Sequence, residues 1–279
     1  MSEYQYYYFE AIDKPLTDQQ QKELRKISTR AQINSRRFEN EYNWGDLSGD
    51  VDSMLKKYFD VHLYYANWGT RMIKFKVPAP TVDFSLLKEY DNGETVRVET
   101  SDNHVIVDIT ADCDDSDEWW EDSLKINKYV SFRDDLMAGD YRCLYIAWLA
   151  GCDGRPRKKK APPIPPGMTK LTGTLQAFVE FMYLDKDQLK TALESASVEE
   201  PSEPTLQEIK DWVACLPDKD RQQILVDLLQ EKMIPQTIQR ELRNRFFKER
   251  NLETSKTKTF ETPCQKKPVK KASKRQPKK

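Results

Sequence analysis

The sequence lacks most of the features from which a chemistry is usually inferred. Its 279 residues include two histidines, His62 and His104, and five cysteines that show neither a C-x-x-C pair nor the spacing of a metal site. It contains no G-x-S-x-G, G-x-x-x-x-G-K-[ST], G-x-G-x-x-G or H-E-x-x-H motif. The sequence therefore predicts no catalytic residue, no metal site and no cofactor.

Long hydrophobic runs are also absent. No stretch approaches the roughly eighteen uninterrupted apolar residues of a membrane span, and the opening MSEYQYYYFE does not have the basic and then apolar character of a secretion signal. An odd number of widely scattered cysteines is typical of a reducing compartment. We therefore expect a cytoplasmic protein that makes no membrane contact.

Charge is present in both signs, but it is unevenly distributed. The formal net charge is −1, yet residues 254–279 hold ten Lys or Arg and a single acid, a net charge of +9. The preceding 253 residues hold 35 basic and 45 acidic side chains, a net charge of −10. The sequence thus predicts an acidic body that carries a basic tail.

The basic tail has almost no apolar residues to offset the entropy of ordering, so we expect residues 251–279 to be disordered when free. A flexible cationic segment can displace counterions from a phosphate backbone, which makes nucleic acid or another polyanion a candidate partner. The alternative is a tail that balances charge by folding back over acidic loops. The candidate contact residues are Lys266, Lys267, Lys270, Lys271, Lys274, Arg275, Lys278 and Lys279.

The length favours two domains, and a Pro-rich basic stretch, GCDGRPRKKKAPPIPPG, marks their boundary. Residues 1–152 have the patterns of an α+β domain, with a mixed or antiparallel sheet and helices mainly on one face. Residues 153–168 form the expected linker. Residues 169–250 are helical in pattern throughout, including a last helix at about 235–250, and predict a small helical domain that can engage a protein partner.

Several elements have specific start and stop signals. Thr17 and Gln20 have the spacing of a capping box for a helix over about 18–27, and Asp50 stands where the N-cap of a second helix should be. A hairpin is expected with its turn at residues 101–103. Residues 136–149 are apolar nearly all round, which predicts one buried helix.

The tripeptide Asn-Trp-Gly occurs twice, at residues 43–45 and 67–69, in a chain with only six tryptophans and nine glycines. Glycine permits a positive φ and asparagine bonds its own main chain in turns, so each copy is typical of a strand-edge turn. If the two strands are neighbours, both indoles lie at the same end of the sheet; alternatively, both fill corners of the core. The candidate rim consists of Asn43, Trp44, Asp46, Asn67, Trp68 and Arg71.

The segment DCDDSDEWWED, residues 112–122, contains seven carboxylates. It does not fit a calcium loop, because Asp117 and Ser123 stand where glycine and glutamate are needed. The segment is either a solvated acidic loop or a docking surface for a basic partner such as the protein's own tail.

Three stretches, EYQYYYFEAIDKPLT, FENEYNWGD and YYANWGTR, resemble a bacterial family of conserved but functionally uncharacterised cytoplasmic proteins. The resemblance covers mainly residues 1–80 and does not reach the lysine-rich tail. It implies a bacterial cytoplasmic setting and carries over no activity, cofactor or catalytic residue.

Two functional hypotheses follow. In the first, the chain is a non-enzymatic binding or regulatory protein whose tail contacts an anionic partner. In the second, it is an enzyme whose pocket near the two Asn-Trp-Gly turns is lined by Glu39, Glu41, Asp46 and Arg71. The second requires these four side chains to converge, which the geometry can decide.

Overall fold

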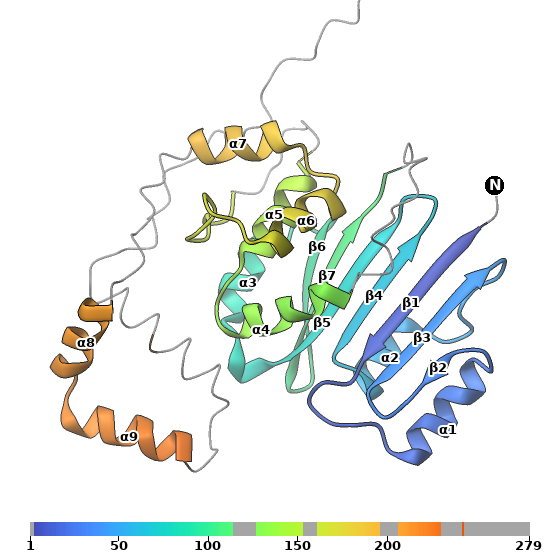
Figure 1. Cartoon of the computed structure of the whole chain (residues 1–279), viewed down its shortest axis with the longest axis horizontal. Helices are drawn as coiled ribbons and strands as arrows, with labels where there is room; N and C mark the ends of the chain where they lie inside the picture. Colours follow the sequence, from blue (N-terminus) through green and yellow to red (C-terminus); the bar gives the residue numbers. More distant parts are fainter. Residues whose placement is uncertain (1–2, 114–126, 153–160, 196–205, 230–241, 243–279) are drawn as a thin grey trace, which may run out of the picture.

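A computed structural model describes residues 3–113, 127–152, 161–195, 206–229 and 242. The described chain forms a seven-stranded sheet of order β2-β3-β1-β4-β5-β7-β6 in which every neighbouring pair is antiparallel (Figure 1). The α+β architecture predicted from the sequence is confirmed. The strands are β1 (Tyr4–Glu10), β2 (Gln32–Ile33), β3 (Arg37–Asn43), β4 (Val61–Ala66), β5 (Arg71–Pro78), β6 (Val96–Ser101) and β7 (His104–Ala111).

The described helices pack on the two faces of this sheet, except for the last two, whose described side chains belong to neither core. They are α1 (Asp18–Ile27), α2 (Val51–Tyr58), the short 3-10 helix η1 (Ala79–Thr81), α3 (Phe84–Tyr90), α4 (Phe132–Met137), α5 (Arg142–Ala150), α6 (Gly173–Phe181), α7 (Lys186–Ser195), α8 (Leu206–Cys215) and α9 (Asp218–Leu229). Side chains of α3 to α7 share one core with one face, and Figure 1 shows α3 to α6 over the β5–β7–β6 half. Helices α1 and α2 contribute to the core on the opposite face. The expectation of helices mainly on one face is thus only partly right.

Strand β1 lies near the middle of the sheet and shows how the two cores arise. Because side chains alternate along a strand, Tyr4, Tyr6 and Tyr8 belong to the core under α3 to α7, while Tyr7 and Phe9 belong to the core under α1 and α2. All five aromatic residues are buried. A strand buried on both faces loses the alternation of apolar and polar residues, which is why the four consecutive residues Tyr6 to Phe9 are all aromatic.

The helix signals read from the sequence are present in the structure. The Thr17 hydroxyl accepts a hydrogen bond from the Gln20 amide, and the Gln20 side chain accepts one from the Thr17 amide, which completes the capping box of α1. The Asp50 carboxylate accepts from the Ser53 amide at 2.8 Å and caps α2. Both helices begin where their caps place them.

The single helix expected over residues 136–149 is wrong. The chain forms two helices, α4 and α5, and leaves helical geometry at Gly139, whose φ is +81°. A positive φ is accessible to glycine at little cost, so the chain turns there and still buries apolar side chains on both sides of the break.

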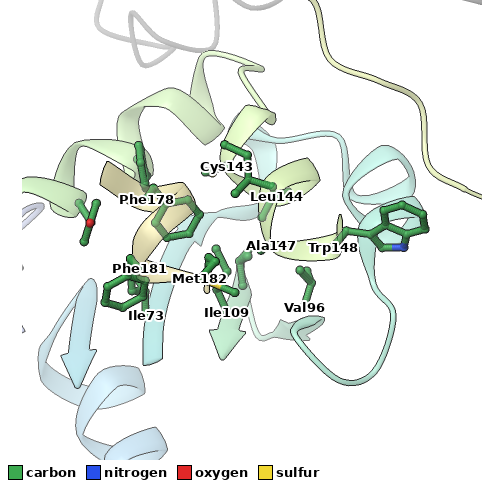
Figure 2. Close-up of a cluster of buried hydrophobic side chains, with 14 of the residues drawn as sticks. Ile73, Val96, Ile109, Cys143, Leu144, Ala147, Trp148, Phe178, Phe181 and Met182 are labelled. Carbon is green, nitrogen blue, oxygen red and sulfur yellow. The ribbon is translucent and has the colours of Figure 1, made fainter. Parts of the chain in front are cut away.

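The expected boundary at residues 153–168 does not separate two cores. Figure 2 shows Phe178, Phe181 and Met182 of the α6 region in one cluster with Ile109 of β7 and Ala147 of α5. All five side chains are buried. Helix α6 therefore belongs to the same core as the sheet, and the described end of the linker is anchored there as well. The Tyr90 hydroxyl donates to the Pro163 carbonyl at 2.9 Å, and Met168 is buried.

Some sequence predictions fall outside the described residues. These are most of the acidic segment (114–122), the start of the linker (153–160), the helix expected at 235–250 apart from Leu242, and the basic tail (251–279).

No helix in the described part of the chain is both long enough and apolar enough to cross a lipid bilayer.

Candidate functional site: the tryptophan end of the sheet

The two Asn-Trp-Gly turns lie on either side of the first residue of β1. Tyr4 pairs with Asn43 across β1 and β3, while on its other side Asn67 donates its amide to the Tyr4 carbonyl at 3.0 Å. The Asn67 side-chain oxygen accepts from the Tyr4 amide at 2.9 Å. The strands that precede the turns, β3 and β4, are thus separated by β1 rather than adjacent, and the turns stand at the same end of the sheet about 10 Å apart, two strand spacings.

Both indoles at this end are exposed. Trp44 has 67% of its surface accessible and Trp68 has 44%. The alternative in which both tryptophans fill corners of the core is therefore wrong. We call residues 3–5, 40–50, 66–71 and 110–113, which contain the turns and the adjoining strand ends, the tryptophan end of the sheet.

The backbone of the turns explains why glycine follows each tryptophan. Gly45 and Gly69 have φ values of +101° and +102°, which side-chain-bearing residues rarely adopt. Trp44 itself has a φ of +79°, an unfavourable left-handed conformation for a bulky residue. The chain thus holds a large, exposed aromatic side chain at a strained backbone position.

We expect Gly45→Ala to lower the free energy of unfolding by about 1–2 kcal/mol, because the added Cβ meets no atom within 4 Å and the whole loss comes from the backbone. Gly173→Ala is the matched control. A Cβ at Gly173 also meets nothing within 4 Å, but Gly173 has no positive φ, so this substitution should cause no loss. Urea unfolding of the two variants checks the difference, and equal stabilities would contradict the turn geometry.

Asp46 lies on the α1 and α2 side of the tryptophan end, in a hydrogen-bonded group of polar side chains. Its carboxylate accepts from the Tyr7 hydroxyl at 2.5 Å and from the Leu47 amide at 2.7 Å. The Gln5 side-chain oxygen accepts from the Tyr64 hydroxyl at 2.8 Å and lies 2.9 Å from the Tyr7 hydroxyl oxygen, and the Gln5 amide group donates to the Gly45 carbonyl. Burial, followed by the hydrogen bond to Asp46, raises the pKa of Tyr7, so its hydroxyl stays a neutral donor. This group fastens the first turn to the sheet.

Arg71 lies on the opposite face and is only 4% exposed. Its guanidinium donates to the carbonyls of Glu180 and Phe181, both at 3.0 Å, at the end of α6, and lies 3.9 Å from the ring centroid of Tyr183. The Tyr183 hydroxyl donates to the Gly69 carbonyl. Arg71 therefore satisfies the last carbonyls of a helix, a structural use of its charge, and fastens the second turn to α6.

Glu39 and Glu41 project from β3 beside the tyrosines of β1. The Tyr6 hydroxyl donates to Glu39 at 2.8 Å, and Glu39 also pairs with Arg37 at 3.2 Å. Burial and then the charge of Glu41 raise the pKa of Tyr4 to about 12. Both tyrosines thus act as neutral hydrogen-bond donors that hold the acids of β3 against the sheet.

The proposed catalytic set does not converge. Asp46 is on the α1 and α2 side of the sheet, whereas Arg71 is buried on the other side against α6. Glu39 shares a face with Arg71 but stands on β3, three strands away from β5 and about 14 Å across the sheet. The geometry therefore gives no support to a pocket built from these side chains.

The tryptophan end has an unusual charge composition. Arg71, buried under α6, is its only basic residue. Its acids are all exposed, and they are Glu3, Glu41, Asp46, Asp50 and Asp112. Among the residues that define this end, a ligand that approaches the two indoles therefore meets exposed carboxylates and no exposed cation.

Neither histidine is placed for catalysis or metal binding. His62 is fully buried on β4, where its Nδ1 lies 3.1 Å from the Tyr8 carbonyl and its ring stacks on Phe9 at 4.1 Å. Within the described residues, Nε2 has no hydrogen-bond partner. His104 begins β7, far along the sheet from His62 in register, and no group of three potential ligands gathers in the described part of the chain.

His62 should make the fold sensitive to acid. Burial, which outweighs the hydrogen bond to Tyr8, lowers the pKa of His62 to about 3. In the unfolded chain His62 has a pKa of about 6.5, so below this pH the unfolded chain binds a proton that the folded chain does not bind. The free energy of unfolding therefore falls as the pH falls from 6.5 towards 3. Between pH 6.5 and 4.5 we expect His62 to account for a loss of about 2 kcal/mol. Urea unfolding of the wild type and of His62→Phe across this pH range measures the loss. If the free energy of unfolding depended on pH in the same way in both proteins, the result would contradict this prediction.

Comparison with protein-family models, curated proteins and solved structures finds no match for this chain. The bacterial cytoplasmic setting implied by the resemblance therefore stays an expectation from the sequence.

Sequence reasoning found both turns but missed what holds and surrounds them. The partners of Arg71 lie 109 and 110 residues further along the chain, and no local pattern indicates them. The acidic character of this end could have been found, because residues 40–50 contain three acids and neither that stretch nor residues 66–70 contains Lys or Arg. That count becomes informative only when the two segments are known to be close in space.

Proposed function

We propose that this chain is a non-enzymatic binding or regulatory protein that contacts an anionic partner, such as nucleic acid, through its cationic segment 254–279. The observation that carries the proposal is the segregation of charge, with a net +9 in that segment against −10 in the rest of the chain. Counterion release from a polyanion gives such a segment affinity that depends little on sequence and strongly on salt.

The exposed aromatic end of the sheet supports this assignment of roles. Aromatic residues can stack on bases, but here the indoles of Trp44 and Trp68 are accompanied by exposed carboxylates. A phosphate backbone would be repelled at this end of the sheet. This leaves the cationic segment as the part of the chain suited to a polyanion.

Helix α8 supports a second, protein partner. Leu206, Ile209 and Val213 recur at i, i+3 and i+7 and are all exposed, so they form an apolar stripe along the helix. Stripes of this kind are typical of helices that lie in the groove of another protein. The exposed stripe supports α8 as the part of the helical region that would contact a protein partner.

The proposal is tested by the binding of fluorescent single-stranded and duplex nucleic acid to the full chain and to residues 1–253 across a salt series. We expect the full chain to bind, and the shorter chain to lose most of the affinity at every salt concentration. Circular dichroism of both proteins controls for folding. Equal affinity of the two proteins would contradict the proposal.

A further inference from the structure

The two exposed tryptophans need a ligand whose chemistry suits both an indole face and a nearby carboxylate. Indole faces carry partial negative charge and attract cations placed over them. The exposed acids of the tryptophan end add full negative charge to the same end of the sheet. A Lys or Arg side chain satisfies both groups at once, whereas a phosphate satisfies neither.

The backbone geometry also suits an extended ligand. The turns stand on either side of β1 about 10 Å apart, and each is fastened to the sheet by hydrogen bonds that involve Gln5 or Tyr4. Successive side chains on one side of an extended chain are about 6–7 Å apart, so cations two to four residues apart can reach both indoles. A rigid pair of aromatic groups loses little entropy when it binds such a chain.

We infer that the tryptophan end binds a Lys/Arg-rich extended segment, and that its occupant is the chain's own residues 254–279. Charge complementarity favours this occupant, because the segment carries ten cations and one acid while the body carries a net charge of −10. Prolines 263, 268 and 277 disfavour a helix in the segment, and lysines recur in pairs at 266–267 and 270–271. The inference goes beyond the proposed function, since it concerns the contact that the segment makes when no polyanion is present.

The stretch of chain that precedes the cationic segment is long compared with the sheet. The 24 residues between Leu229, the last residue of α9, and Thr254 can span at most about 80 Å. The longest strands of the sheet have eight residues, or about 27 Å. Since the segment is tethered, its local concentration at the tryptophan end is that of an intramolecular ligand, which lets weak contacts with individual lysines hold it in place.

The contact also has a consequence for binding. Binding of the cationic segment to the tryptophan end competes with its binding to a polyanion, because the same lysines cannot contact both at once. Removing the two indoles should therefore strengthen nucleic-acid binding by the full chain. Each exposed cation–π contact is worth about 0.5–1 kcal/mol, so loss of two should weaken the internal contact about five- to thirty-fold.

The test is zero-length carbodiimide cross-linking of the full chain at low salt, with peptide mapping of the bonds formed between lysine amines and carboxylates. We expect lysines of residues 254–279 to be joined to Glu41 and Asp46 of the tryptophan end. The double variant Trp44→Ala/Trp68→Ala should lower the yield, at most by the five- to thirty-fold loss in the equilibrium constant of the contact. Leu225→Ala/Val226→Ala, which removes two exposed apolar side chains from α9, should leave the yield unchanged.

Each other outcome overturns the inference. Cross-links from the segment only to acids elsewhere, including residues 114–122, would place it at a different surface. Equal yields in the two double variants would show that charge alone is responsible. Cross-links that form between isotopically labelled and unlabelled copies, rather than within one copy, would make a second chain the occupant. Nucleic-acid affinity of the full chain, measured separately, decides the proposed function and does not depend on these results.

Discussion

Phe178→Ala should lower the free energy of unfolding by about 3–5 kcal/mol, the usual cost of removing a buried phenylalanine ring from a packed core. Phe178 is on α6, beyond the Pro-rich segment, yet it is fully buried. Its ring centroid lies 5.0 Å from that of Phe132 and 5.4 Å from that of Tyr129. The large effect is expected because α6 completes the core of the sheet. If α6 belonged to a separate helical domain, the substitution would destabilise only that domain, and the sheet would unfold in a separate, unchanged transition.

Urea unfolding followed by two probes distinguishes these cases. Far-ultraviolet circular dichroism reports the helices and strands together, while the exchange of β5 and β7 amide protons reports the sheet. We expect both to shift to lower denaturant in Phe178→Ala. Leu206→Ala is the matched control, since Leu206 is 68% exposed on α8 and its loss should change stability by less than about 0.5 kcal/mol. An unchanged midpoint for the sheet amides in Phe178→Ala would contradict the single core.

Asp60→Ala should destabilise the fold by about 3 kcal/mol, because one buried carboxylate serves three partners. One oxygen accepts from the amides of Ile12 and Asp13 at 2.8 and 2.9 Å, and the other lies 3.3 Å from the Lys76 ammonium. Asp60 itself is buried. Alanine leaves two amides and a half-buried cation without these acceptors, at the end of the sheet opposite the tryptophans.

Two controls apportion the loss at Asp60. Asp60→Asn keeps one acceptor oxygen and should lose about half as much as alanine. Asp52→Ala removes the more exposed partner of Lys74, which retains Asp108 at 3.0 Å, and should cost less than about 1 kcal/mol. Chemical unfolding measures all three. If Asp60→Ala and Asp52→Ala lowered the free energy of unfolding by the same small amount, the three contacts of Asp60 would not stabilise the fold as proposed.

The parts of the fold that could be predicted are those with local causes. The capping box at Thr17 and the N-cap at Asp50 involve residues three positions apart, so the sequence contains the whole interaction. The hairpin of β6 and β7 is similarly local, because its two strands pair on either side of the turn expected at residues 101–103. These elements lie where the sequence places them.

The parts that could not be predicted depend on contacts between distant residues. The break at Gly139 was missed because the apolar residues on both sides continue the same pattern. The membership of α6 in the main core depends on Phe178 meeting Tyr129 and Phe132, which are about 50 residues away. A Pro-rich segment indicates a break in helix and not a break in the core, so it does not by itself mark a domain boundary.

The candidate site shows the same division. The turn chemistry of Asn-Trp-Gly was predictable, because glycine and asparagine have strong local preferences. The exposure of Trp44 and Trp68 was not predictable, because a tryptophan near the end of a strand can pack in a corner of the core or lie on the surface. The topology decides between them by placing both turns at the end of β1, beyond the helices that cover the sheet (Figure 1).

The central claim is that cations of the segment 254–279 make the contact with a polyanion, and the salt dependence of duplex binding by the full chain tests it most directly. Each phosphate neutralised contributes about −0.9 to the slope of log K against log salt. Replacing Lys266, Lys267, Lys270 and Lys271 by glutamine should therefore make the slope shallower by about 3 to 4. A slope that is the same in the wild type and in this quadruple variant would contradict the account.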